Sequence, residues 1–260
     1  MRKLLPLLTL VAVLAACATN PVTGRRSLQL VPENQMQALG LQAYKEVLAK
    51  SQVSNDARRT EIVRRVANRI AAVTNKDYNW EVNLIDSNEA NAFVLPGGKI
   101  VVYTGILPIC ENEAGLAFVL GHEVGHAIAR HGGERISQSM VVEAGLTVAD
   151  ISLRSNSQRG LIMAALGVGA QYGVMLPFSR DNESEADHMG IVYMAKAGYD
   201  PSEAPKLWQR MAARGGPQPP EFLSTHPSHA TRIQQLNDLL PKALSLYEAA
   251  EPKYGLGAKL

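Results

Sequence analysis

The sequence predicts an α+β domain that is mainly α-helical and contains one small β-sheet. Several long stretches carry apolar residues at helical spacing, whereas residues 80–103 alternate apolar and polar residues with a period of two. The chain has 260 residues, of which 46% are hydrophobic and 19% are charged, so it can bury one substantial core. The formal net charge is only +2 and no basic tract is present. A nucleic acid is therefore not an expected partner.

The first 17 residues have the shape of a secretory signal. Arg2 and Lys3 precede an apolar run that ends in a Leu-Ala-Ala-Cys motif at Cys17. This motif resembles a bacterial lipobox, which implies a lipoprotein signal peptide at 1–16 and a lipidated Cys17 that holds the chain on a membrane. By the same resemblance, Ala18 implies a bacterial outer-membrane location facing the periplasm. An ordinary signal peptide or a short membrane anchor is the alternative.

The remaining chain is expected to form a short tether at 17–32 and a single domain at 33–250. Turn residues Pro96, Gly97 and Gly98 separate two β-rich runs and predict a hairpin. Cys110 has no expected disulfide partner and is expected to be a small buried side chain. The predicted helices span 33–50, 56–73, 116–131, 141–151, 179–197, 201–211 and 227–246, and the predicted strands span 80–85, 91–95 and 99–103.

The apolar helix at 116–131 contains the pattern H-E-x-x-H, formed by His122, Glu123 and His126. Residues four apart lie on one face of a helix, so the two imidazoles can bind one metal ion. Glu123 lies one step around the helix, where a carboxylate can take a proton from water. Burying these groups without partners would cost several kcal/mol, about 2–7 for a polar group. The alternative is a core helix whose histidines hydrogen-bond to neighbours.

A catalytic zinc ion usually has three protein ligands, so a third donor is expected elsewhere. The cluster Glu183, Glu185 and Asp187 opens the helix predicted at 179–197. Glu183 and Asp187 are four residues apart and share a face, while Glu185 points away. One of the pair can bind the metal while the other hydrogen-bonds a ligand imidazole. A favourable interaction of acids with the helix dipole is the alternative explanation.

Taken in order, the motifs NAFVLPGGKIVVYTGIL, HEVGH, ESEAD and THPSHATRI resemble the HtpX and CAAX-prenyl-protease family of zinc metallopeptidases. The lipobox and NPVTGRRSLQLV resemble its single-domain periplasmic lipoprotein branch. The resemblance implies a zincin-like metallopeptidase domain of the gluzincin type, with its small sheet packed on the H-E-x-x-H helix. It further implies one zinc ion held by His122, His126 and Glu183, with Asp187 supporting a ligand.

The segment from Thr225 to Arg232 matches the H-P-x-x-x-x-R pattern of that family. A His or Arg near the metal can donate to the developing oxyanion, so His226 is expected in the site and Arg232 in a supporting or donor role. A helix-start His and a surface ion pair are the alternatives. His131 and His229 are expected to be incidental.

Two segments are candidates for contact with a substrate. The edge of the hairpin can pair with an extended peptide through main-chain hydrogen bonds, or it can merely complete the sheet. The apolar run 161–178 is expected to be a buried or lid-like helix, with a membrane-spanning helix as the alternative. The expected substrate-binding residues are Asn91, Ala92, Phe93 and Val94.

The expected function is zinc-dependent endopeptidase activity in the bacterial cell envelope, directed at misfolded or misassembled envelope proteins. Glu123 is the expected general base. One alternative is a chaperone-like lipoprotein that holds client proteins in the same cleft. Another is a latent protease in which His226 or the segment 134–178 blocks the metal until it is released.

Overall fold

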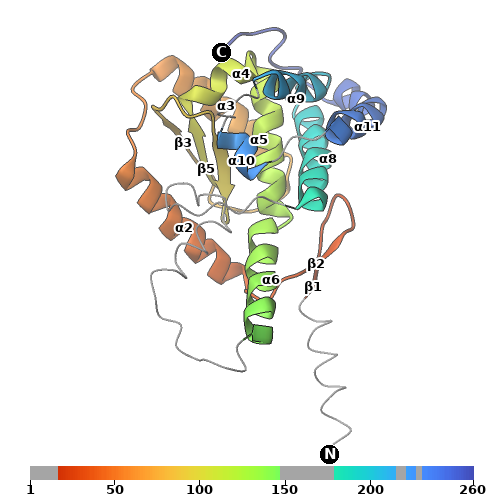
Figure 1. The fold of residues 1–260 in the computed structure, drawn as a ribbon. Helices are drawn as coiled ribbons and strands as arrows, with labels where there is room; N and C mark the ends of the chain where they lie inside the picture. Colours follow the sequence, from red (N-terminus) through yellow and green to blue (C-terminus); the bar gives the residue numbers. More distant parts are fainter. Residues whose placement is uncertain (1–16, 147–178, 215–220, 227–229) are drawn as a thin grey trace, which may run out of the picture.

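The computed structural model describes residues 17–146, 179–214, 221–226 and 230–260 (Figure 1). It confirms a mainly helical α+β domain with small sheets. The helices of the described residues are α2 (Glu33–Lys50), α3 (Ala57–Ala72), the 3-10 turn η1 (Thr104–Ile106), α4 (Leu107–Cys110), α5 (Glu113–Ile128), α6 (His131–Leu146), α8 (Arg180–Lys196), α9 (Glu203–Ala213), α10 (Glu221–Thr225) and α11 (Ala230–Ala249). The strands are β1 (Cys17–Thr19), β2 (Arg26–Leu28), β3 (Glu81–Ile85), β4 (Ala92–Leu95) and β5 (Lys99–Tyr103).

The larger sheet has the order β3-β5-β4, with β3 parallel and β4 antiparallel to the central β5. The predicted hairpin is confirmed, since Leu95 pairs with Lys99 next to the turn. Gly98 has a φ of 82°, and a Cβ atom there would lie 2.8 Å from the indole of Trp80. Only glycine satisfies both conditions, so the turn is set by local sterics. Strand β4 lies at the edge of the sheet.

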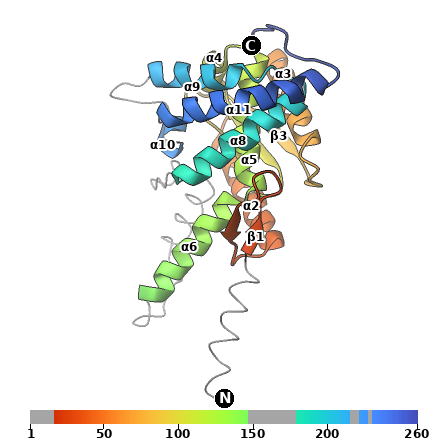
Figure 2. The same cartoon turned by 90° about the vertical axis from the view of Figure 1, so that its right-hand side faces the viewer.

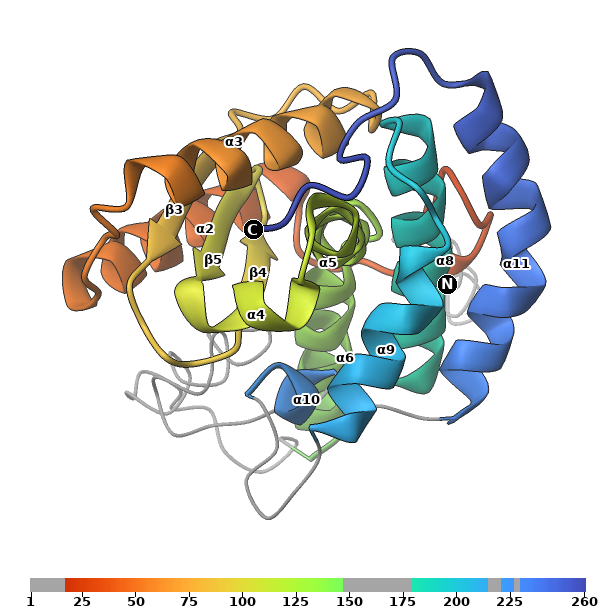
Figure 3. The same ribbon diagram turned by 90° about the horizontal axis from the view of Figure 1, so that it is seen from above.

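Alternation along the strands sends side chains into two cores. Phe93 and Val101 face α2 on one side of the sheet, whereas Val94 and Ile100 face α3 and α5 on the other. Figure 3 shows these helices on opposite faces of the sheet. The sheet is therefore buried on both sides, and its edge strand β4 runs beside the metal-motif helix α5.

Beyond α5, the helices α8 and α11 follow as successive layers (Figure 3). Asn112 caps α5 by accepting a hydrogen bond from the Gly115 backbone, and Ser179 caps α8 through the Asn182 backbone. Gly198, with a φ of 80°, lies just beyond α8, where the left-handed conformation ends the helix. Helix α5 is thus enclosed between the sheet and α8, and all of its residues are buried.

Segment 17–32, the expected short tether, contains the antiparallel hairpin β1–β2, which lies beside α6 (Figure 2). The Asn20 side chain accepts hydrogen bonds from the backbone of Val22 and Thr23, which shapes the turn. The hairpin is fixed to the rest of the protein because Arg25 is ion-paired to Glu134 of α6. The division of the chain into domains stays a prediction.

The junction between α5 and α6 differs from the expected one. Helix α5 ends at Ile128, and α6 begins at His131, ten residues before the predicted start at Val141. Arg130 separates the two helices with a left-handed φ of 58°, a conformation that no glycine signals in the sequence. The expected lid at 161–178 lies outside the described residues. Within the described ranges, no helix has the length and apolar character needed to cross a bilayer.

Candidate metal centre

Helix α5 carries both histidines of the H-E-x-x-H pattern on its buried face. The Nε2 atoms of His122 and His126 lie 3.1 Å apart, as expected for residues one helical turn apart. Glu123 is on the same helix and is only 3% exposed. The apolar residues of α5 pack into the core around them and keep this part of the helix away from water.

Helix α8 brings the acidic cluster against α5. Glu183 approaches both histidines, with its Oε1 atom 3.4 Å from His126 Nε2 and its Oε2 atom 3.6 Å from His122 Nε2. Asp187 lies one turn further along and its Oδ1 atom is 3.0 Å from the outer nitrogen, Nδ1, of His122. The two acids on one face of α8 therefore reach opposite sides of the His122 ring.

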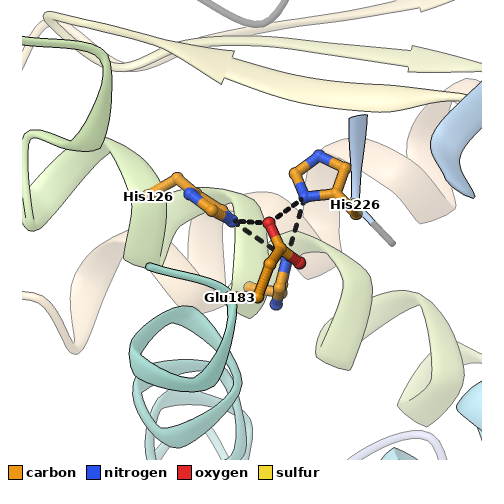
Figure 4. A group of neighbouring side chains, drawn as sticks. His126, Glu183 and His226 are labelled. Atoms are coloured by element: carbon orange, nitrogen blue, oxygen red, sulfur yellow. Dashed lines mark hydrogen bonds and ion pairs between the residues drawn. The ribbon is translucent and has the colours of Figure 1, made fainter. Parts of the chain in front are cut away.

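His226, which follows α10, completes the group of four potential donors. Its Nδ1 atom lies 3.0 Å from Glu183 Oε1 and 3.3 Å from His122 Nε2. Figure 4 shows His126 and His226 on two sides of the Glu183 carboxylate. Donor atoms of His122, His126, Glu183 and His226 all lie within 4.8 Å of one another, and all four residues are buried.

This donor set fits a zinc ion. Three imidazoles and one carboxylate converge at a single point, and nitrogen and oxygen donors of this kind are the usual ligands of catalytic zinc. The Nε2 atoms of His122 and His126 are buried only 3.1 Å apart beside the Glu183 carboxylate. This arrangement is unfavourable unless a cation or shared protons lie between these groups. Glu123 Oε1 is also buried and makes no hydrogen bond.

Behind His122, the side chains of Arg232 and Trp208 hold the Asp187 carboxylate. Arg232 donates from Nε to Oδ2 at 2.6 Å and from Nη2 to Oδ1 at 2.7 Å, and Trp208 Nε1 donates to Oδ1 at 3.2 Å. The Arg232 guanidinium also stacks on the Trp208 ring, 3.7 Å from its centroid. With Asp187 fixed in this way, His122 donates from Nδ1 and presents its Nε2 lone pair to the donor group.

Arg232 is 2% exposed and joins the two acids of α8. Its Nη1 atom lies 2.6 Å from Glu183 Oε2, in addition to its bonds to Asp187. Burial alone would raise the pKa of Glu183, but the charges of His226 and Arg232 outweigh it and hold that pKa well below its ordinary value. Glu183 is therefore ionised and ready to bind a cation at neutral pH.

Glu123 is the carboxylate whose pKa moves in the opposite direction. Burial raises the pKa of Glu123 to about 7. Its Oε1 atom is 3.4 Å from His226 Nε2. A carboxylate with this pKa can both accept and return a proton near neutral pH, as a general acid–base group must.

His131, which the sequence leaves without a role, lies directly behind His126. The two Nδ1 atoms are 2.8 Å apart, and His131 Nε2 is 2.9 Å from Glu185 Oε2. Glu185 points away from the donor group, as predicted, but toward this histidine. The five-residue spacing from His126 does not place His131 on the same helical face, so the only signal in the sequence is a third histidine after the motif.

The expected substrate-binding residues lie in or next to β4. Asn91, Ala92, Phe93 and Val94 are each less than 9% exposed. Their side chains therefore belong mostly to the two cores, and β4 offers its main chain at the sheet edge. Val94, Pro96 and His126 line one small pocket, which connects this edge to the donor group.

Comparison with known proteins identifies the class. The peptidase family M48 model matches residues 53–240. The chain therefore belongs to peptidase family M48, and its domain is that of a zinc metalloendopeptidase.

Particular relatives cover different shares of the chain. The mitochondrial metalloendopeptidase OMA1 of Schizosaccharomyces pombe is 38% identical over 229 residues, which is 86% of this chain and 66% of that protein. The human mitochondrial OMA1 is 31% identical over 88% of this chain and 47% of its own length. The beta-barrel assembly-enhancing protease of Escherichia coli is 34% identical over 58% of this chain and 32% of its own length. The chain thus spans about a third to two thirds of these proteins.

The expected bacterial outer-membrane location is wrong in the light of these relatives. Both OMA1 proteins, which align with more than four fifths of the chain, are mitochondrial by name. The location was inferred from the N-terminal segment, its lipobox-like end at Cys17 and the following Ala18, and this segment lies outside the peptidase domain that the family model matches.

Proposed function

We propose that the chain is a zinc-dependent endopeptidase that cuts misfolded or misassembled envelope proteins. The observation that carries the proposal is the convergence of His122, His126 and Glu183, with Glu123 beside them. The substrate class is supported by the similarity to the beta-barrel assembly-enhancing protease. The arrangement has the two parts that peptide hydrolysis requires, a cation site and a carboxylate able to exchange a proton.

In this proposal, His122, His126 and Glu183 hold the zinc ion. Zinc would supply the Lewis acidity that polarises the scissile carbonyl and activates water. Glu123 accepts a proton from the attacking water and delivers it to the leaving amine. Its burial serves this role, since a carboxylate with a pKa of about 7 is a stronger base than an exposed one and can still release its proton near neutral pH.

Two further side chains are assigned to the reaction. His226 is proposed to donate from Nε2 to the oxygen that becomes negatively charged on the substrate carbonyl. Burial alone would lower the pKa of His226, but Glu183 and Glu123 outweigh it and raise that pKa, which favours the donating imidazolium. Arg232 is proposed to support the site by holding the carboxylates of Glu183 and Asp187.

The substrate is proposed to bind as an extended strand along the free edge of β4. The edge position of β4 and its course beside α5 support this. Main-chain hydrogen bonds from residues 91–94 would bind many sequences, as suits a protease for unfolded chains. The pocket at Val94 and His126 would then receive one substrate side chain.

The test compares the parent chain with Glu123→Gln on an unfolded model protein, with bound zinc quantified in both. We expect cleavage by the parent and zinc retention with a loss of at least about 100-fold in the variant, because only the proton-accepting oxygen is replaced. Glu61→Gln, on the exposed face of α3, is a control that should retain full activity. Cleavage by zinc-loaded Glu123→Gln at the parent rate would refute the assigned base.

A latent protease is the second candidate, and the position of His226 favours it. His226 Nδ1 lies as close to the shared carboxylate as either histidine of α5 does, so this ring can occupy the position that water or substrate requires. Latency predicts that His226→Ala cleaves faster than the parent. The donor role predicts the opposite change.

We also propose that a lipid on Cys17 anchors the chain to a membrane. We further propose that the chain belongs to the single-domain lipoprotein branch of the HtpX and CAAX-prenyl-protease relatives. The lipobox-like sequence that ends at Cys17 supports both proposals. Mass spectrometry of the chain expressed in bacteria should show a mature N-terminus at Cys17 that carries acyl chains. Cys17→Ser should then be released from membranes, while an unmodified cysteine in the parent would contradict the proposal.

A further inference from the structure

Five side chains form a second polar cluster on the far side of His126 from the donor group. We call them the supporting cluster: Thr23, Arg25, His131, Glu134 and Glu185. His131 is fully buried and Glu185 is 5% exposed. The cluster joins the N-terminal hairpin, the start of α6 and the start of α8, which are distant in sequence.

The hydrogen bonds of this cluster determine which ring nitrogen of His131 and of His126 carries the proton. Glu185 Oε2 is an acceptor, so His131 must carry its proton on Nε2, 2.9 Å away. The Nδ1 atom of a neutral His131 is then an acceptor for the Nδ1 proton of His126, at 2.8 Å. That leaves the lone pair of His126 on Nε2, the atom that faces Glu183 and His122.

The backbone conformation at Arg130 places His131 beside His126. Arg130 adopts a left-handed φ of 58°, which ends α5 and interrupts its helical phase before the next residue. A helix that continued past Ala129 would place residue 131 on a different face from His126. The Arg130 side chain secures the turn by donating to the Val31 carbonyl at 2.8 Å and pairing with Glu33 at 2.7 Å.

The N-terminal hairpin holds Glu185 from the other side. Arg25 Nε donates to Glu185 Oε2 at 2.5 Å, and Thr23 Oγ1 donates to Oε1. The two terminal nitrogens of Arg25 bind Glu134 at 2.9 and 2.7 Å. Both oxygens of Glu185 are therefore occupied, and the carboxylate has one orientation, the one that meets His131.

From this geometry we propose that His131 and Glu185 are positioning residues that fix His126 as a metal ligand, and that Arg25 of the N-terminal hairpin holds Glu185 for this purpose. The inference rests on the proposed role of His126 as a ligand. It makes the hairpin part of the metal site, although no residue of the hairpin belongs to the donor group. On His122 the carboxylate of Asp187, held by Arg232, contacts the ring directly, whereas on His126 the ring of His131 lies between the ligand and the carboxylate of Glu185.

The test measures zinc affinity by competition with a chromophoric chelator in the full 260-residue chain. His131→Phe keeps a ring but removes both nitrogens, and we expect zinc to bind about 10- to 100-fold more weakly. His131→Gln, which can still accept from His126 and donate to Glu185, should restore part of the affinity. Arg25→Ala should weaken zinc binding by a smaller factor, whereas Arg26→Ala, an exposed neighbour on the same hairpin, should not change it.

A second readout does not involve zinc. In the metal-free chain at about pH 8, nitrogen-15 NMR should show neutral His131 protonated on Nε2 and neutral His126 protonated on Nδ1. Should His131→Phe fail to fold, Arg25→Ala and these NMR signals still test the proposal, because Arg25 is partly exposed.

The outcomes separate this proposal from the proposed function. If the parent chain bound no zinc, the result would contradict the proposed metal site and thus the proposed function. A parent that binds zinc, with His131→Phe and Arg25→Ala both within about threefold of its affinity, would overturn the positioning role. Variants that lose thermal stability but keep the zinc affinity of the parent would show that the supporting cluster serves folding alone. A neutral His131 that carries its proton on Nδ1 in place of Nε2 would likewise overturn the proposal.

Discussion

Gly121 of α5 and Gly190 of α8 bring the backbones of the two helices into direct contact. A Cβ atom on Gly121 would lie 2.8 Å from the Gly190 carbonyl oxygen, and one on Gly190 would lie 2.9 Å from the His122 backbone nitrogen. Both distances are too short for a methyl group to be accepted without a shift of the backbone. This contact sets the separation of the helices and thereby the approach of Glu183 to the histidines.

Gly190→Ala should therefore destabilise the protein and weaken the metal site together. We expect a loss of about 1–3 kcal/mol in the free energy of unfolding, because α8 must move away from α5. Urea unfolding and chelator competition measure the two effects. Ser184→Ala, which removes from α8 a partly exposed hydroxyl that donates to Gln235 of α11, is the control and should stay within about 0.5 kcal/mol of the parent. Parent-like zinc affinity in Gly190→Ala would show that the helix separation does not control the site.

Arg232→Met should be among the most destabilising single changes in this domain. The variant leaves the Asp187 and Glu183 carboxylates buried without their cation, which costs about 3–5 kcal/mol. Bound zinc should reduce the loss, because it neutralises Glu183. The measurement is urea unfolding of the metal-free and zinc-loaded forms.

Arg59→Met is the matched control for Arg232→Met. Arg59 pairs with Asp56 at 3.5 Å, and both side chains are more than 40% exposed, so its removal should cost less than about 1 kcal/mol. Equal losses in the two variants would contradict the assigned importance of the buried arginine.

His226→Ala should lower kcat by about 100-fold or more while zinc remains bound, because a donor to the developing oxyanion is removed. Steady-state kinetics with parallel zinc analysis measure this. His188→Ala, which replaces a half-buried histidine outside the donor group, should change kcat little. An increase in kcat on removal of His226 would instead favour the latent protease.

The ion pair of Glu134 with Arg25 should make the protein less stable at acidic pH. Burial alone would raise the pKa of Glu134, but Arg25 outweighs it and holds that pKa below its ordinary value of 4.5. At pH values just below 4.5 the unfolded chain therefore binds more protons than the folded one, so stability falls as the pH falls. The stability difference between the parent and Glu134→Gln should be greatest above pH 4.5 and should shrink below it in urea titrations. A difference that does not change with pH would contradict the prediction.

Much of the fold follows from local patterns. The helical spacing at 33–50 and 56–73 and the alternation at 80–103 predict elements that the structure confirms to within one or two residues. Gly97 and Gly98 predict the hairpin turn because few other residues adopt its positive φ values. The boundary between α5 and α6 escaped prediction because Arg130, not glycine, takes the left-handed conformation there.

The sequence by itself determined that the chain is a zinc metallopeptidase and which residue types its site contains. His122, Glu123 and His126 lie in one helical segment, and Glu183 and Asp187 share a helical face because they are four residues apart. Helical spacing alone therefore predicts both groups. Only the tertiary structure decided how they are held. The contact of Gly121 with Gly190, the convergence of His226, and the link from His126 through His131 and Glu185 to Arg25 join residues up to 160 positions apart. Packing of α5 against α8 and of the hairpin against α6 and α8 creates these contacts, and no periodicity along the chain encodes them.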